Sequence, residues 1–393
     1  MPPPRRINWD VLRILAVAAV LLQHATHAGP AVHPELSPPL FTVSLEMGAS
    51  TLVVISAFFA CASLAKGQPA RFLRNRLARL VPAYVVAAVC TYAVLTRVAP
   101  EGWSQLEPRD LVVNALMLQN WFPDARLVDF SYWTLPVQVT GFVAGALLAS
   151  RVRGRALKAL LWALVAAPLV LRVWTVEPGA VRTLYDGFGM HRGQLFAAGV
   201  SLWLWSKGRL GSRHLTALLL AALTAQAVHT ADIASTVALG VLLVGVAACA
   251  KGPDWDIGPV RFLRRPVKWL AGISYGVYLV HQEIGYVAMA GVARFGPAVE
   301  LATFLGTAVL LGWLLTRFVE KPAFKALTAS HRPVVVRLVL AARLHSAQSH
   351  LGSAGAAPSS GAPLWRPVSH ASTSAADPLT SIEPLLAVSS QLR

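Results

Sequence analysis

The chain has 393 residues, of which 55% are hydrophobic and 13% are charged, and its mean hydropathy is +0.55. This composition is far too apolar for a soluble globular protein of this length. The formal net charge of +17 does not indicate a nucleic-acid partner, because the lysines and arginines lie between apolar segments instead of forming one basic face. We therefore predict an all-α polytopic membrane protein, in contact with membrane lipid and with no nucleic acid.

Ten apolar segments are long enough to cross a membrane. They cover residues 9–27, 41–64, 80–97, 131–150, 156–174, 190–206, 214–230, 233–250, 269–290 and 298–318. With the N-terminus in the cytoplasm, the inner connections carry 21 lysines and arginines and the outer connections carry 7, as the positive-inside rule requires. We expect about ten transmembrane helices with both termini cytoplasmic. The composition is typical of a high-GC bacterium, so we expect a multi-pass protein of a bacterial cell membrane.

Three parts of the chain need separate interpretation. A cleaved signal peptide is the alternative for the first span, because Arg5 and Arg6 precede a short apolar core. Residues 111–122 are apolar but too short to cross, which favours an interfacial or re-entrant segment. From residue 329 on, the composition shifts to alanine, serine, proline and glycine. We expect residues 1–328 to form the membrane domain and residues 329–393 to form a disordered cytoplasmic tail.

The first span carries three polar residues in an otherwise apolar run: Asp10, Arg13 and His24. Charged and titratable groups at membrane depth are costly, and they persist where they face a cavity or a partner. Arg13 and His24 are eleven residues apart, so a helix places both on one face about 16 Å apart. The span is therefore a candidate functional helix, with a cation near one end and an imidazole near the other.

Four local patterns, with a short one in the last span, resemble one family of membrane proteins, acyltransferase family 3. They are the first span with its Arg-x10-His pair (Arg13 and His24), which begins INWDVLRILA at residue 7; RFLRNRLARLVPAY at 71–84, with its Arg-x-x-Arg pair; SYWTLPVQV at 131–139; SYGVYLVH at 274–281; and VEKP at 319–322. The resemblance extends over nearly all of residues 5–325. It implies an acyltransferase, transferring groups other than aminoacyl groups, that moves an acyl group, often acetyl, from acyl-CoA to a hydroxyl of a glycan, a lipid or a secondary metabolite such as a macrolide.

On this interpretation the arginines of the second pattern hold the donor. Arg76 and Arg79 lie one helical turn apart, and guanidinium groups bind phosphate well. The alternative is that they only obey the positive-inside rule and contact lipid phosphates. Arg13 is predicted to position the donor, although Asp10, three residues away on nearly the same face, is a candidate ion-pair partner. Acyl-CoA is expected as a co-substrate, with no bound cofactor.

His24 is the predicted catalytic base. A neutral imidazole can take the proton of an acceptor hydroxyl while that hydroxyl attacks the thioester. An acyl-histidine intermediate is the mechanistic variant, and the sequence does not separate the two. A packing histidine, hydrogen-bonded between helices, is the structural alternative. His27, near the outer end of the span, is expected to be interfacial.

The last two patterns supply supporting residues. His281 is expected to orient a polar network or to contact substrate, and the alternative is a structural hydrogen-bonded pair with Tyr278 between helices. Glu283, two residues beyond His281, is placed on a different helix face. Glu320 is expected to anchor the last span by pairing with an inner arginine.

One position departs from the family pattern. Many members have a glutamate where this chain has Gln138, and a glutamine forms hydrogen bonds but carries no charge and cannot act as a base. This change implies another group in that role, altered acceptor specificity or a loss of catalysis. A separate partner enzyme that completes the transfer is a further alternative, because the tail is too short for a fused soluble domain.

Two further features complete the sequence-based predictions. The three cysteines, Cys61, Cys90 and Cys249, lie in apolar segments, so neither a disulfide framework nor a metal site is expected. A transporter or exporter is the alternative function, with the buried polar residues forming a substrate or proton pathway. Such proteins often have internal repeats, and the two halves of this chain show no convincing repeat.

Overall fold

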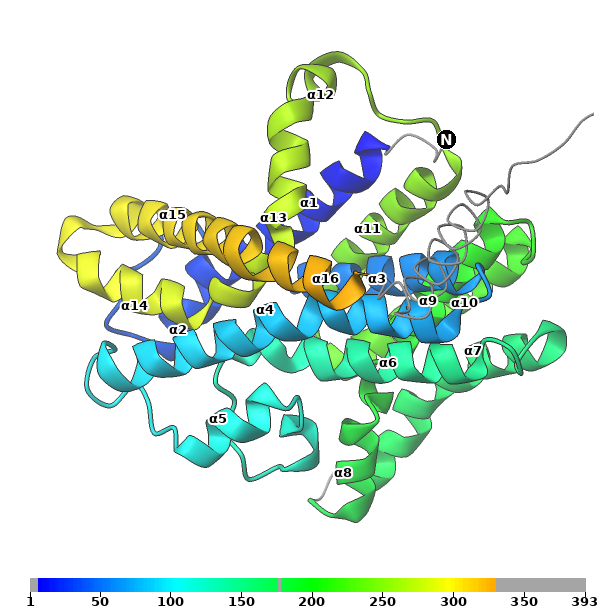
Figure 1. The fold of residues 1–393 in the computed structure, drawn as a ribbon, viewed down its shortest axis with the longest axis horizontal. Helices are drawn as coiled ribbons and strands as arrows, with labels where there is room; N and C mark the ends of the chain where they lie inside the picture. The colour runs from blue at the N-terminus through cyan, green and yellow to red at the C-terminus, as the bar shows by residue number, and fades with distance from the viewer. Residues whose placement is uncertain (1–5, 176–177, 330–393) are drawn as a thin grey trace, which may run out of the picture. The chain divides into compact units, whose positions relative to one another are not determined.

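The computed structural model describes residues 6–175 and 178–329 of the chain, and these residues form helices and connecting loops with no strand (Figure 1). The expectation of a helical protein is confirmed for this part of the chain. The tail predicted from residue 329 lies outside the described residues from residue 330 on.

The longer helices follow the predicted apolar segments. They are α1 Ile7–Gln23, α3 Gly48–Leu64, α4 Pro69–Arg97, α6 Thr134–Leu148, α7 Gly154–Val170, α9 Gly193–Ser206, α10 Ser212–Thr230, α11 Ile233–Lys251, α13 Arg264–Val280, α14 Glu283–Val292 and α15 Pro297–Leu315. Each predicted segment therefore corresponds to one helix, except the ninth, which contains two.

Shorter elements connect them. The short α-helices are α2 Gly29–Val32, α5 Pro108–Ala115, α8 Ala180–Gly187, α12 Gly258–Phe262 and α16 Lys321–Thr328. The 3₁₀ and π turns are η1 His24–Ala28, η2 Gln119–Trp121, η3 Phe130–Trp133, η4 Leu171–Trp174, η5 Met190–Arg192, η6 Ala293–Phe295 and η7 Thr316–Glu320. The segment 111–122 thus forms the end of α5, a tight loop and η2, too short to cross a bilayer.

Within residues 6–175 and 178–329, five continuous helical stretches are long and apolar enough to cross a membrane. They are Ile7–Val32, Pro69–Arg97, Gly154–Trp174, Ile233–Lys251 and Pro297–Thr328, and Gly48–Leu64 is a shorter apolar helix. These stretches support a membrane protein. The total of ten spans and the cytoplasmic position of the termini remain predictions.

Small residues allow the central helices to approach closely, as is common in membrane bundles. A Cβ atom at Gly48 of α3 would overlap the carbonyl oxygen of Ala16 in α1. At the crossing of α13 and α15, a Cβ at Gly276 would overlap the carbonyl oxygen of Gly312, and one at Gly312 would lie 2.5 Å from the backbone nitrogen of Val277. These glycines fix the distances between the helices that carry the polar site.

Two π-helical turns occur where a proline follows closely in the sequence. The turn η1 starts at His24 and precedes Pro30, and the turn η7 ends at Glu320 and precedes Pro322. Proline lacks an N–H and its ring collides with the carbonyl four residues earlier, so the preceding turn widens to accommodate it. His24 therefore begins a wide turn, a local geometry that often occurs at functional sites.

The ninth predicted span, residues 269–290, is not one continuous helix. The helix α13 ends at Val280, and α14 begins at Glu283 after a bend at His281 and Gln282. A regular helix would pair the N–H of Glu283 with the carbonyl of Leu279. Here that carbonyl accepts the hydroxyl of Tyr132 at 3.0 Å, and the N–H of Glu283 donates to the carboxylate of Asp129 at 3.3 Å. The break is stable because both released backbone groups have new partners.

The segment that supplies these partners is itself held rigidly. Asp129 is 1% exposed and accepts hydrogen bonds from the backbone N–H of Ser131 at 2.8 Å and from its hydroxyl at 2.5 Å. Tyr132 donates to Leu279, so the hydroxyl of Thr91 donates in turn to Tyr132, at 3.1 Å. Asp129, just before the SYWTLPVQV pattern, and Tyr132, within it, therefore stabilise the break between α13 and α14.

Candidate active site

A basic cavity lies at one end of α3 and α4. Its volume is about 640 Å³, and Tyr275 and Tyr278 of α13 form part of its wall. Its polar lining includes Arg13, Lys66, Gln68, Arg71, Asn75, Arg76, Arg79 and Gln138. The side chain of Arg76 lies against two rings that contact each other, with its guanidinium carbon 5.6 Å from the centre of Phe72 and 5.2 Å from that of Phe142. This concentration of guanidinium and ammonium groups fits a ligand with several phosphates.

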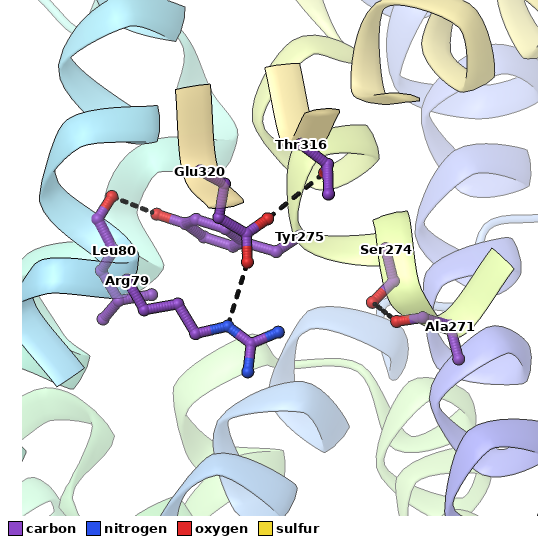
Figure 2. A network of polar contacts seen from close by, with 7 residues as sticks. All are labelled: Arg79, Leu80, Ala271, Ser274, Tyr275, Thr316 and Glu320. Carbon is purple, nitrogen blue, oxygen red and sulfur yellow. Dashed lines mark hydrogen bonds and ion pairs between the residues drawn. The ribbon is translucent and has the colours of Figure 1, made fainter. Parts of the chain in front are cut away.

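The Arg79 side chain is positioned by the last span. Its Nε donates to the Glu320 carboxylate at 3.0 Å, and the same carboxylate accepts the Thr316 hydroxyl at 3.2 Å (Figure 2). The hydroxyl of Tyr275 donates to the carbonyl of Leu80 at 2.8 Å and joins α13 to α4 beside this pair. The predicted pairing of Glu320 with an arginine is confirmed, and the position of this pair at the inner membrane face stays a prediction. Arg79 remains 53% exposed and lines the cavity.

A second cavity, here called the histidine cavity, has a volume of about 540 Å³. Its polar lining includes Gln23, His24, Glu46, Ser131, Arg192, Gln226, Thr230, Tyr278, Gln282, Glu283 and Tyr286. The wide turn that starts at His24 and the break before Glu283 both border this space. The two local departures from regular helix thus meet at one cavity.

His24 and His281 form a hydrogen-bonded pair. Nδ1 of His24 lies 2.9 Å from Nε2 of His281, and the ring centres are 4.9 Å apart. Nδ1 of His281 lies 2.8 Å from the backbone carbonyl of Tyr278, which can only accept, so this nitrogen carries a proton. With both rings neutral, Nε2 of His281 must then accept the proton of Nδ1 of His24. Nε2 is then the basic nitrogen of the His24 ring, which lines the cavity, and this nitrogen has no hydrogen bond within the described residues.

The two cavities lie at opposite ends of the same helices. Along α1, Arg13 lines the basic cavity and His24 lines the histidine cavity. Along α3, residues between Leu52 and Ser63 line the basic cavity, and the N-terminal turn lines the histidine cavity. Tyr278 lines both. Its hydroxyl donates to the carbonyl of Ser131 at 2.9 Å and accepts from the hydroxyl of Thr134 at 3.1 Å. The wall between the cavities therefore consists of residues from the SYWTLPVQV and SYGVYLVH patterns.

The predicted site residues divide between these cavities. The structure brings Arg13 together with Arg76 and Arg79 in the basic cavity, where Gln138 also lies. It does not place Arg13 in the cavity of His24, so their shared helix face does not make one site. Asp10 is 2% exposed and lines neither cavity.

Two expectations need correction. Tyr278 and His281 do not form a side-chain pair between helices, because His281 bonds to the backbone carbonyl of Tyr278 within one helix end. Glu283 is not directed away from the site as a continuous helix would require. The break between α13 and α14 places Glu283 in the lining of the histidine cavity.

Gln138 lies in the basic cavity, so the glutamate found at this position in many family members would lie near the arginines and not beside His24.

Sequence analysis missed two charged residues of the histidine cavity, Glu46 and Arg192, and it placed a third, Glu283, on a different helix face. The guanidinium carbon of Arg192 lies 4.1 Å from the ring centre of Trp133. Glu46 and Arg192 lie within five residues of the outer ends predicted for their spans, at residues 41 and 190, so a search for charges near those ends would have found both. Glu283 lies seven residues inside the predicted outer end at residue 290, and its place in the cavity follows from the break in the helix.

The loop that carries Glu46 is attached to α11. Its backbone N–H donates to the hydroxyl of Ser235 at 2.8 Å, and that hydroxyl donates to the carboxylate of Asp232, which caps α11. The hydrogen bonds from Ser235 hold the pKa of Asp232 below its usual range. The cap is therefore charged at neutral pH, and it holds the rim of the histidine cavity.

These observations define a helical membrane protein with two polar cavities, one of which is bordered by a hydrogen-bonded histidine pair. The chain matches the acyltransferase domain model of acyltransferase family 3 over residues 6–317, and it belongs to that family. No match to a curated protein or to a solved structure was found. The resemblance seen in the sequence is confirmed, and the protein is a membrane acyltransferase.

Proposed function

We propose that this protein transfers an acyl group, acetyl in the first instance, from acyl-CoA to a hydroxyl of an acceptor molecule. It lies in a bacterial cell membrane with about ten spans and both termini in the cytoplasm. In that orientation the basic cavity faces the cytoplasm, where acyl-CoA is available. The observation that carries the proposal is the His281–His24 pair, which leaves one basic nitrogen on the surface of a cavity.

The donor occupies the basic cavity. Arg76 and Arg79 bind its phosphates, and Lys66 and Arg71 add positive charge to the same lining. Arg13 positions the pantetheine arm farther along α1. The thioester then lies near Tyr278, the residue that both cavities share.

His24 acts as the general base from the other side. Its Nε2 takes the proton from the acceptor hydroxyl, the oxygen forms a bond to the thioester carbonyl carbon, and the carbon–sulfur bond breaks. The coenzyme A thiolate leaves and is protonated by His24, which restores the neutral ring. During the step the positive charge on His24 is stabilised by the hydrogen bond from its Nδ1 to His281. An acyl-histidine route uses the same nitrogen as nucleophile, and trapping of an acylated protein would distinguish it.

The test is release of coenzyme A by the purified protein in detergent, given acetyl-CoA and a panel of alcohols. We expect His24→Ala to lower acceptor-dependent release by at least about 100-fold, the usual contribution of a general base. His27→Ala is the matched control, because His27 is exposed and lines neither cavity. It should retain wild-type activity. Full activity of His24→Ala in folded protein would refute the proposed role.

The transporter alternative has a separate outcome. Family membership supports acyl transfer. Uptake of a labelled compound into vesicles without coenzyme A, together with no release of coenzyme A by the wild type, would instead favour transport.

A further inference from the structure

A threonine hydroxyl lies in the middle of the wide turn that begins at His24. Thr26 is 3% exposed, and its Oγ1 donates to the backbone carbonyl of Leu22 at 2.7 Å. The same oxygen accepts the backbone N–H of Val43 at 3.0 Å. One hydroxyl therefore joins the turn to α1 on one side and to the loop of residues 33–47 on the other.

The turn needs such a contact because a helix can accommodate Pro30 in more than one way. In a regular helix the ring of Pro30 would collide with the carbonyl of Thr26, four residues earlier. A helix relieves this collision either by kinking or by widening one turn. Here it widens, because the N–H of Gly29 bonds to the carbonyl of His24, five residues earlier. An additional contact is required to select this form over the kinked one.

The loop that contacts Thr26 is itself attached to other helices. Before Val43, the hydroxyl of Ser37 donates to the carboxylate of Glu300 in α15 at 2.6 Å. After Val43, the N–H of Glu46 bonds to α11. Val43 is thus fixed from both sides, and its N–H holds Thr26 in the place that it has in the wide turn.

The hydrogen bond of His24 depends on the geometry of this turn. The carbonyl of His24 takes part in the turn, and its ring nitrogen lies 2.9 Å from that of His281. A shift of about 1 Å would take this pair out of hydrogen-bond range. Misplacement of that size can lower a rate about 100-fold. Thr26 lines neither cavity, so its effect on the reaction must pass through the turn and the loop.

We propose that Thr26 is a positioning residue for the catalytic base. Its two hydrogen bonds hold the turn in the one form that places the ring of His24 against His281. It also joins the base to the rim of the histidine cavity, because Glu46, three residues after Val43, lines that cavity. This proposal rests on the proposed function, since the position of His24 matters for the rate only if His24 is the base.

The test variant is Thr26→Val, which keeps the shape of the side chain but removes both hydrogen bonds. With acetyl-CoA and the most active alcohol of the panel, we expect kcat to fall at least about tenfold, while the KM for acetyl-CoA changes less than about twofold. The ¹⁵N NMR spectrum of His24, which needs no acceptor, should change from one tautomer to a mixture of two. Thr26→Ser keeps the hydroxyl and should retain the wild-type kcat and the single tautomer.

The matched control is Thr51→Val. Thr51 is 0% exposed, its hydroxyl donates to the carbonyl of Met47, also four residues earlier, at 2.8 Å, and it lines neither cavity. Both valine variants lose a buried hydroxyl, so both should lower the melting temperature. Only Thr26→Val should change kcat and the tautomer of His24. If Thr26→Val does not fold, Thr26→Ala, which also lacks the hydroxyl, is measured in its place.

Failure of this proposal and failure of the proposed function give different results. If His24→Ala lowers coenzyme A release but Thr26→Val leaves kcat and the tautomer unchanged, or if Thr51→Val has the same effect, Thr26 only packs and the acyltransferase proposal stands. If His24→Ala retains full activity, there is no base to position and both proposals fail.

Discussion

The basic cavity and the histidine cavity use the same helices but differ in how they present polar groups. The basic cavity has five cationic side chains, and one of them, Arg79, already has a carboxylate partner in Glu320. The histidine cavity has few charges, a hydrogen-bonded pair of imidazoles and several buried polar atoms that have no partner among the residues the structure describes. One cavity is suited to a ligand defined by its charge and the other to a ligand defined by its hydrogen bonds.

This difference follows from the construction of the two ends. The basic cavity is built from regular helices, α3 and α4, whose long side chains reach into it. The histidine cavity is bordered by a π turn at His24 and by the break between α13 and α14, where the backbone itself is irregular. Irregular backbone can direct polar side chains where a regular helix would not, and proton transfer requires such groups in fixed positions. Variants at the two ends should therefore change different kinetic constants.

The largest effect that tests this difference is expected for His281. In His281→Ala the ring of His24 loses the acceptor that holds the proton on Nδ1, and Nε2 is no longer reserved as the base. We expect kcat to fall about 100-fold, with the KM for acetyl-CoA almost unchanged. The ¹⁵N NMR spectrum of His24 should change from one tautomer to a mixture of two.

The matched variant is His281→Gln, whose side-chain carbonyl can accept from Nδ1 of His24. It should recover part of the activity and part of the single-tautomer signal. If His281→Ala retained the wild-type kcat and the wild-type tautomer, the relay from Tyr278 through His281 to His24 would be wrong. A purely structural role would instead lower the melting temperature of both variants and leave the tautomer unchanged.

An intermediate effect is expected in the basic cavity. Arg76→Ala removes a guanidinium that lies against the rings of Phe72 and Phe142, and we expect the KM for acetyl-CoA to rise about tenfold with little change in kcat. Arg74→Ala is the control, because Arg74 is exposed and does not line the cavity. Equal effects of the two variants would show that the segment contributes only general positive charge.

The smallest effect is expected for the pair that restrains Arg79. Glu320→Gln keeps one oxygen that can accept from Arg79, replaces the oxygen that accepts the Thr316 hydroxyl by an NH2 group that can only donate, and removes the charge. Because Arg79 is about half exposed, the loss of stability should be below about 1 kcal/mol, measured by chemical unfolding or by the melting temperature. The KM for acetyl-CoA should fall by up to about twofold, since Arg79 is then free for the donor. A tenfold rise in that KM would mean that Glu320 binds the donor directly.

Much of the helical layout could be predicted from the sequence. The apolar segments match the longer helices, and the family patterns lead to the residues around both cavities. The pairing of Glu320 with an arginine also followed from their expected positions at one end of the bundle. Each of these predictions depends on a local property, such as the hydropathy, length or charge of a segment, that hardly depends on the rest of the chain.

The division of the polar residues into two cavities could not be predicted in this way. Arg13 and His24 share a helix face, yet contacts with other helices place them in different cavities. Glu283 was assigned to another face because a continuous helix was assumed. Its N–H instead bonds to Asp129, 154 positions away in the chain, and Tyr132 takes the carbonyl that this N–H would have used. Such an exchange of hydrogen bonds depends on groups that only the folded chain brings together, and for that reason hydropathy and spacing predicted the helices, whereas the helix break, the histidine pair and the contacts of Thr26 became visible only in the packed protein.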